Sequence, residues 1–374
     1  MDKRGINMHF EISKQELLAA IHRVEGAIPN KTTLPILSNM LVETIDGKVN
    51  FSATDLDLSI VFQSIADVIE EGAITIPSRR FAEIIKELPN EKVSINTKNG
   101  YNIYINCGLC SFKLNGLPKE EFPLLPEFER SESVVMEQGV FKTMLKKVSF
   151  AMSKDETRHI LNGTFFLFKN NTLNLAATDS RRIAIIQNTQ SFNLKNEKRL
   201  IIPTKMIIEL SRALQDKGNL EIAFAVNQVA FQLNKTILIS RLIEGEFPPY
   251  EQAIPNQNYN KMKIDKQLFL SALKRVGLFT SIDSQSVKMD IFKEKLIVSK
   301  ITPDVGEAKE NINIEYGHSE ISINVNPFFM IDILKVLDKD VVEFEIEDEK
   351  PCVIKEDNAE SGKLIYIVLP MTIK

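Results

Sequence analysis

The sequence predicts an α+β protein built from three tandem copies of one domain, each with two helices laid on antiparallel sheet. The chain has 374 residues, whereas single hydrophobic cores stop growing near ~250–300 residues. Two short segments recur along the chain at a spacing of about 125 residues. Between them, short stretches alternate between polar and apolar residues, as strands with one buried face do.

The first recurring segment combines an aliphatic residue, two basic residues or histidine, and valine. It occupies residues 21–24, 145–148 and 273–276, which lie 124 and 128 residues apart. Each copy closes a stretch with helical periodicity, as in Leu17 and Ile21. The segment therefore predicts one helix in every repeat.

The second recurring segment occupies residues 76–88, 202–214 and 325–337, at spacings of 126 and 123 residues. Each copy begins with proline beside Ser, Thr or Asn, which is typical of helix starts. An acid recurs inside it and is followed three residues later by a base, in the pairs Glu83 and Lys86, Glu209 and Arg212, and Asp332 and Lys335. A second helix per repeat is predicted.

Further landmarks occur twice and support the same division. Ala-Thr-Asp stands at 53–55 and 177–179, Glu-Phe-Pro stands at 121–123 and 246–248, and the third copy near 302–304 is degenerate. Strands are expected where polarity alternates, at 92–96, 101–105, 219–224 and 343–347. We predict domains at 8–127, 136–255 and 262–374, with polar or acidic linkers at 127–136 and 251–263.

Charge is distributed unevenly between helices and the rest of the chain. The net charge is −4, yet the six predicted helices hold fourteen bases and six acids, so they carry +8 and the remainder −12. Lys and Arg neutralise phosphates without reading sequence, and no aromatic residues interleave these bases as in single-strand binders. The residues expected to face duplex DNA are Arg23, Arg79, Lys86, Lys146, Lys147, Lys205, Arg212, Lys274, Arg275 and Lys335.

Catalytic and metal sites are not expected. Cys107 and Cys110 have redox or zinc spacing, but zinc needs about four ligands and Cys352 is distant. The four histidines lack metal spacing, and no glycine-rich nucleotide-binding loop is present. Asp55 and Asp57 resemble a carboxylate pair that the second repeat abolishes, so a turn role is predicted. A thiol-redox or metal enzyme built on the two cysteines stays an alternative.

The sequence also predicts a cytoplasmic protein without a cofactor. No apolar run approaches the ~18 residues needed to cross a bilayer. The first seven residues lack the apolar stretch of a secretion signal, and the periodic pattern begins only near Met8.

Together these segments resemble the bacterial DNA polymerase III beta subunit, the replication sliding clamp. The resemblance covers essentially the whole chain from Met8. It is carried by residues 34–39 (LPILSN), 53–58 (ATDLDL), 116–118 with 121–123, 158–163 (RHILNG), 177–179, 246–248 with Tyr250, and 366–371 (YIVLPM).

The resemblance implies a DNA clamp fold in which two chains close head to tail into a six-domain ring around duplex DNA. It implies a non-catalytic processivity factor whose partners are DNA, a second copy, a clamp loader, and DNA polymerase or other proteins with short clamp-binding peptides. The residues it assigns to the ring closure are Arg80, Phe112, Leu114, Leu278, Phe279, Asp304, Glu307 and Glu310. A monomeric adaptor that never meets DNA is the alternative.

The resemblance also implies a peptide pocket between the second and third domains. Its residues are Arg158, Leu161, Thr178, Arg182, Ile183, Pro248, Asn326, Phe329, Val353, Ile367, Leu369, Pro370, Met371 and Ile373. Apolar grooves of this kind accept aliphatic and aromatic anchors, and Met supplies an adaptable wall. Four positions, Ser180, Arg181, Gln252 and Thr372, depart from the common pattern, which could alter the preferred peptide.

Overall fold

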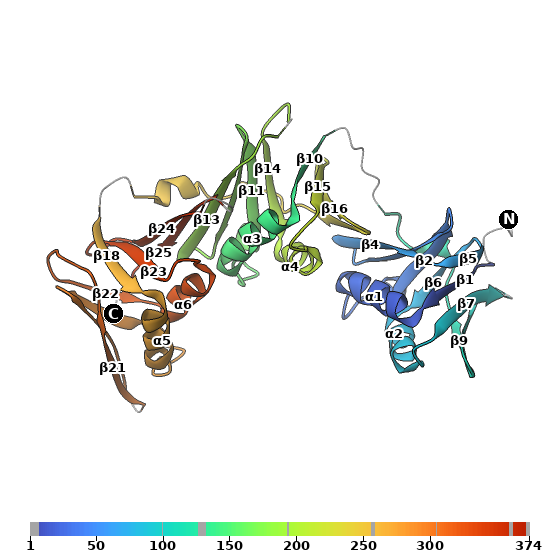
Figure 1. Ribbon diagram of the computed structural model, residues 1–374, viewed down its shortest axis with the longest axis horizontal. Coiled ribbons are helices and arrows are strands. Elements are labelled where there is room, and N and C mark those ends of the chain that lie inside the picture. The colour runs from blue at the N-terminus through green and yellow to red at the C-terminus, as the bar shows by residue number, and fades with distance from the viewer. Residues whose placement is uncertain are drawn as a thin grey trace. The chain divides into compact units, whose positions relative to one another are not determined.

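The computed structural model describes residues 7–98, 100–125, 132–192, 194–255, 259–303, 305–358 and 362–371 (Figure 1). They fall into two compact units. The first comprises Met1–Gly139 with Ile208–Leu242, and the second comprises Val140–Ile207 with Ile243–Lys374. The second repeat contributes residues to both units, because its strands pair with strands of both neighbouring repeats.

Two helices form in each predicted repeat, as the recurring segments indicated. The described residues contain α1 (Lys14–Val24), α2 (Ser78–Glu87), α3 (Gln138–Val148), α4 (Thr204–Ala213), α5 (Lys266–Gly277) and α6 (Pro327–Val336). Polar caps fix several starts: the Asp265 carboxylate accepts the Leu268 N–H ahead of α5, and Asn326 caps α6.

The first unit contains two antiparallel sheets. One has the order β5-β1-β7-β8-β9, with β5 (Asp67–Glu70), β1 (His9–Ser13), β7 (Lys92–Lys98), β8 (Asn102–Cys107) and β9 (Cys110–Asn115). The other has the order β10-β15-β16-β17-β4-β3-β2-β6, with β10 (Ser133–Glu137), β15 (Asn219–Phe224), β16 (Gln228–Leu233), β17 (Thr236–Arg241), β4 (Leu58–Ile65), β3 (Lys48–Thr54), β2 (Asn39–Ile45) and β6 (Ala73–Pro77). Helix α1 packs on β3 and β4, and α2 on β2 and β6.

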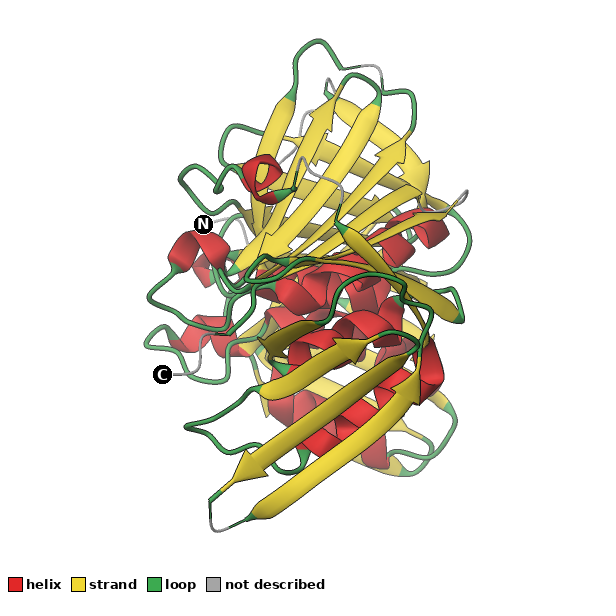
Figure 2. Ribbon diagram, turned by 90° about the vertical axis from the view of Figure 1, so that its left-hand side faces the viewer, coloured by secondary structure: helices red, strands yellow, loops and turns green. Residues whose placement is uncertain are grey.

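The second unit repeats this plan (Figure 2, strands in yellow and helices in red). Its larger sheet has the order β14-β11-β12-β13-β25-β24-β23-β18, with β14 (Lys198–Pro203), β11 (Gly163–Lys169), β12 (Thr172–Thr178), β13 (Arg182–Thr189), β25 (Gly362–Val368), β24 (Cys352–Asn358), β23 (Val341–Ile346) and β18 (Asn260–Asp265). Its smaller sheet has the order β21-β20-β19-β22, with β21 (Gly306–Asn313), β20 (Lys295–Thr302), β19 (Val287–Phe292) and β22 (Ile321–Val325). Helix α5 packs on α6, β20 and β21.

One strand joint occurs twice between successive repeats. In the first joint, β17, the second strand of hairpin β16–β17 in the second repeat, pairs with β4, the second strand of hairpin β3–β4 in the first repeat. In the second joint, β25, the second strand of hairpin β24–β25 in the third repeat, pairs with β13, the second strand of hairpin β12–β13 in the second repeat. Hairpin β8–β9 of the first repeat and hairpin β20–β21 of the third repeat correspond to the hairpins that form these two joints. Within the part of the chain that the structure describes, β9 and β21 are edge strands of their sheets.

The strands expected from alternating polarity are confirmed, but the linker prediction is partly wrong. Residues 133–137 form β10 and residues 260–265 form β18, and both strands begin inside stretches expected to be linkers. Val134 and Met136 are buried, so β10 does alternate, although its neighbours are acidic and the run is short. Residues 127–131 of the first predicted linker lie outside the described residues.

Between the helices and the sheets, aromatic side chains form the core. In the second unit, Phe141 of α3 meets Phe166 of β11 with ring centroids 5.8 Å apart. Phe269 of α5 meets Phe344 of β23 at 5.5 Å. Neighbouring strand residues point to opposite faces, so Phe165, next to Phe166, belongs to the other face of the sheet.

Candidate functional site

The repeated Ala-Thr-Asp segment folds into the same turn in both copies. The Asp55 carboxylate accepts the backbone N–H groups two and three residues later at 3.0 and 2.7 Å, and Asp179 does the same at 3.0 and 3.0 Å. The hydroxyls of Thr54 and Thr178 each donate to the carbonyl four residues later. The predicted turn role is confirmed, and the second turn positions Arg182.

Arg182 stands at the centre of a buried network in the second unit. Its Nε donates to Asp179 at 3.0 Å, one Nη to Asp332 at 2.8 Å, and the other Nη to the Phe150 carbonyl at 2.7 Å. The guanidinium lies 4.5 Å from the Phe329 ring centroid and 5.2 Å from that of Phe150. Its side chain is only 9% exposed, so this predicted pocket residue lies beneath the surface with each nitrogen occupied.

The end of the chain brings apolar side chains to the surface near this network. Leu369 is 44% exposed, and Pro370 and Met371 are half-buried. The Leu369 N–H donates to the Arg181 carbonyl at 2.9 Å, and the Met371 N–H donates to the Asn324 carbonyl at 2.7 Å. These two bonds fix the segment between the turn before β13 and the edge of β22.

Other members of the predicted pocket divide by burial. Leu161, Ile183 and Phe329 are half-buried, and Pro248 is exposed. Four members of the predicted pocket lie beneath the surface and are at most 5% exposed: Thr178, Asn326, Val353 and Ile367. Thr178 and Asn326 serve the turn and the α6 cap, while Val353 and Ile367 are cross-strand neighbours in the layer beneath. Ile373 lies outside the described residues.

The residues on one side of the predicted pocket are polar. Arg158 donates to the Ser180 hydroxyl, and its Nε lies 3.5 Å from the Asp155 carboxylate. Ser180 has a φ of 74°, a left-handed conformation that glycine adopts more readily. Serine at this position therefore costs some strain but supplies a hydroxyl that holds Arg158.

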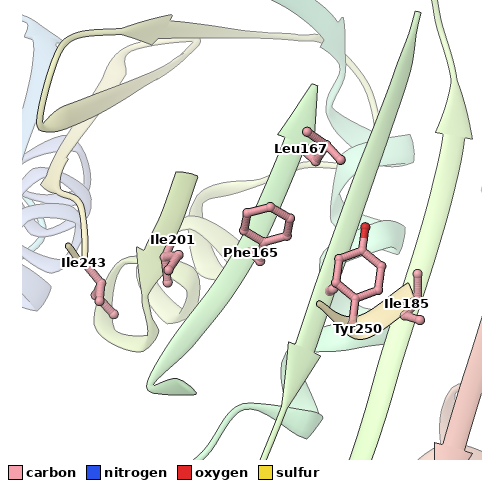
Figure 3. Close-up of a cluster of buried hydrophobic side chains, with 7 residues drawn as sticks. Phe165, Leu167, Ile185, Ile201, Ile243 and Tyr250 are labelled. Carbon is pink, nitrogen blue, oxygen red and sulfur yellow. The ribbon is translucent and has the colours of Figure 1, made fainter. Parts of the chain in front are cut away.

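An apolar cluster lies on the sheet face opposite to Phe166 and contacts Ile183 of the predicted pocket. The buried members of this cluster are Phe165, Leu167, Ala176, Ile185, Ile201, Ile243 and Tyr250. Figure 3 shows Phe165 of β11 and Tyr250 near each other. Phe247 stacks on Phe165 with ring centroids 5.0 Å apart, and Ile183 also packs against the cluster. Phe247 was not among the residues expected at the site, although the repeated Glu-Phe-Pro segment was the available signal.

Nine of the ten residues expected to face DNA reach solvent. Arg23 is half-buried, and Arg79, Lys86, Lys146, Lys205, Arg212, Lys274, Arg275 and Lys335 are exposed. The prediction for Lys147 is wrong, because its side chain is 2% exposed and forms an ion pair with Asp338 at 2.5 Å. Lys147 follows the buried Met144 by three residues and therefore falls on the same helix face. With the observed bounds, Asp338 follows α6, so the helices hold fourteen bases and five acids.

Several of these bases already have acidic partners. Arg212 pairs with Glu209 at 2.6 Å within α4. Arg275 of α5 makes two bonds to Glu310 of β21, at 2.5 and 3.0 Å. The guanidinium lowers the pKa of the Glu310 carboxyl below its usual value. A predicted DNA contact is thus paired with a predicted ring-closure residue.

The described residues predicted for ring closure lie on the edge strands β9 and β21, directly after α5 and, in the case of Arg80, on α2. Phe112 of β9 is 39% exposed and Leu278 after α5 is 78% exposed. Arg80 and Glu307 are exposed, and Leu114, Phe279 and Glu310 are half-buried. Asp304 lies outside the described residues.

Burial favours the protonated thiol of Cys107 and of Cys352. Cys107 and Cys110 face each other across hairpin β8–β9, and burial raises the pKa of Cys107. Burial raises the pKa of Cys352 to about 12. A reactive cysteine needs the opposite shift. Among the described residues, no three or more His, Cys, Asp or Glu side chains are grouped to hold a metal, and no helix is long and apolar enough to cross a membrane.

Comparisons with known proteins agree over almost the whole chain. Three family models of the DNA polymerase III beta subunit match: the N-terminal domain at residues 8–126, the central domain at 135–249 and the C-terminal domain at 251–372. The beta sliding clamp of Chlamydia pneumoniae is 32% identical over 364 residues, covering 97% of this chain and 99% of that protein.

Solved structures give the same result. The DNA polymerase sliding clamp of Bacillus subtilis is 29% identical with a TM-score of 0.92, covering 98% of this chain and 100% of that one. The sliding clamp of Bartonella birtlesii, solved bound to griselimycin, is 28% identical with a TM-score of 0.91 over the same shares.

Proposed function

The chain belongs to the DNA polymerase III beta subunit family, the bacterial sliding clamps, and from this premise we propose that two copies close head to tail into a ring around duplex DNA. As a sliding clamp it acts as a processivity factor for DNA polymerase. The proposed mechanism is mechanical: encirclement prevents dissociation, and the ring itself catalyses no reaction. We place it in the cytoplasm.

The observation that carries the ring is the repeated strand joint. Joints β17–β4 and β25–β13 each unite the second strands of two hairpins from successive repeats. Strands β9 and β21 are the corresponding second strands that remain at sheet edges in the described residues. Pairing β9 of one chain with β21 of another would form the same joint a third time. A two-chain ring contains this contact twice and leaves neither edge open.

The side chains on the two edges suit such a joint. Phe112 and Leu114 lie on β9, while Glu307 and Glu310 lie on β21, and Leu278 is exposed close by. Apolar contacts flanked by charge can close specifically and still reopen. Reopening is needed for DNA to enter, and we assign it to a separate clamp loader.

The DNA contact is proposed to be electrostatic and sequence-neutral. The exposed bases of the helices outnumber the acids there, and such contacts release counterions rather than read base edges. Because retention comes from topology, the contacts need only be weak. The acidic remainder of the chain would discourage DNA from binding elsewhere by repulsion within about 8 Å.

Partner proteins are proposed to dock at the apolar end of the chain. Leu369, Met371 and Phe329 supply accessible apolar surface above a buried layer, which suits a short peptide with aliphatic or aromatic anchors. Polymerase and other clamp-binding proteins would share this pocket. We propose that griselimycin, present in a solved relative, binds this chain here.

Sedimentation analysis tests the ring directly. One chain has a mass of 42.4 kDa, and the proposal expects a species of twice that mass. A single-chain mass at all concentrations would instead favour the adaptor alternative. For the pocket, Met371→Ala should weaken griselimycin binding by about 1–2 kcal/mol, as truncation of a buried anchor does. Unchanged binding in isothermal titration would move the pocket elsewhere.

A further inference from the structure

Asp332 of α6 makes a contact that its counterparts in the other repeats do not make. Its carboxylate accepts a hydrogen bond from Arg182, which lies 150 residues earlier in the preceding repeat, at 2.8 Å. The equivalent Glu209 pairs with Arg212 three residues away, and Glu83 pairs with arginines of its own helix. Of the three, Asp332 is the one whose carboxylate pairs with a base of another element, whereas the Glu209 carboxylate packs against Gly26 of the first repeat.

The Asp332–Arg182 contact lies beside the strand that leads into the proposed peptide site. Arg182 is the first residue of β13 and pairs with Val368, the last residue of β25. The next residue, Leu369, is exposed and bonded to the Arg181 carbonyl. Asp332 therefore connects α6 to the point where the accessible apolar segment begins.

The same contact fixes an aromatic side chain. Phe329 precedes Asp332 by three residues, so both lie on one side of α6. The Arg182 guanidinium sits 4.5 Å from the Phe329 ring centroid, within the range of a cation–π interaction. Asp332 and Phe329 thus hold Arg182 together, while Phe150 contacts it through its carbonyl and ring.

We infer that Asp332 is a positioning residue of the peptide site: it holds Arg182 and thereby keeps Phe329 beside the segment that follows β25. The inference rests on the proposed peptide-binding function. Arg182 need not touch the peptide, since each of its nitrogens already donates to a protein acceptor. The ligand class is the same apolar peptide, and Asp332 sets the geometry that receives it.

The test compares Asp332→Ala with Glu209→Ala in the full chain. Both variants remove one helical carboxylate at the equivalent repeat position, but only the first breaks an ion pair between elements. With griselimycin as the probe in isothermal titration, Asp332→Ala should bind about three- to ten-fold more weakly, which is within the range for mutations along a coupled network. Glu209→Ala should bind like the unmodified chain.

Arg182→Lys should weaken binding at least as much, because one ammonium cannot reach three acceptors as the guanidinium fork does. Adding Asp332→Ala to Arg182→Lys should cause little further loss, since both changes break the same contact. Fully additive losses would overturn the inference.

A second readout separates positioning from general stabilisation. With 4-fluorophenylalanine placed at position 329, Asp332→Ala should shift the fluorine resonance before any probe is added, and Glu209→Ala should not. A lowered Tm with an unmoved resonance and unchanged affinity would overturn the inference. If the unmodified chain fails to bind griselimycin, the proposed pocket falls instead, and the fluorine resonance still decides whether Asp332 positions Phe329.

Discussion

Phe112→Ala should open the proposed ring. A phenylalanine offers roughly 200 Å² of surface, so 39% exposure leaves about 80 Å² that closure would cover. At ~25 cal/mol per Å² this contributes about 2 kcal/mol at each interface. Because a two-chain ring contains the interface twice, the variant should lose about 4 kcal/mol, or roughly a thousand-fold in the dimer dissociation constant.

Sedimentation equilibrium over a wide concentration range measures this constant. Ile69→Ala is the matched control, because Ile69 is 58% exposed on β5, at the opposite edge of the same sheet. The control should dimerise like the unmodified chain. Equal dissociation constants for Phe112→Ala and the unmodified chain would refute β9 as a closing edge.

Three other predictions concern individual side chains. Lys146→Ala should reduce the slope of log affinity for duplex DNA against log salt by about one, because one fewer phosphate is neutralised. Lys147→Ala should leave that slope unchanged and lower the free energy of unfolding by about 2 kcal/mol, because it breaks a charged hydrogen bond. Salt titrations of DNA binding and denaturant unfolding measure the two effects, and the reverse pattern would place Lys147 on the DNA surface. Glu310→Gln should be less stable than the unmodified chain near neutral pH, and the difference in free energy of unfolding should vanish on acidification. A carboxyl whose pKa is lowered in the folded state stabilises the protein fully above its ordinary pKa of about 4.5. This stabilisation is lost as the pH falls through the lowered pKa of the folded state. A difference that grows in acid would contradict the pairing with Arg275. Changing Cys107 and Cys110 together to Ser should leave retention on circular DNA unaltered, and a loss of any activity would revive the thiol-enzyme alternative.

The repeated architecture could be predicted because its turns and helix starts are specified locally. The Asp55 and Asp179 side chains accept hydrogen bonds from backbone N–H groups two and three residues later, so the same short motif marks the first two copies. The helices follow from apolar periodicity and entry residues. The strand β10 was missed because five residues among acidic neighbours give little periodic signal.

The site was harder to predict because its contacts join distant positions. The Arg182 network brings together Asp179, Asp332 and Phe150, and no local pattern connects a strand residue with a helix 150 positions away. The sequence also does not indicate which of two similar residues is buried. Lys146 and Lys147 form a basic pair, but only Lys146 is exposed. The family resemblance implied the proposed pocket region, and the structure separates the accessible surface of these residues from the layer beneath.

Retention on DNA of different topology tests the central claim most directly. The protein, placed on nicked circular DNA by a clamp loader and isolated with it, should remain bound for long periods at moderate salt. Cutting the circle once with a restriction enzyme should release the protein rapidly, because a ring slides off an open end. Equal residence on the circle and on the cut linear molecule would contradict encirclement.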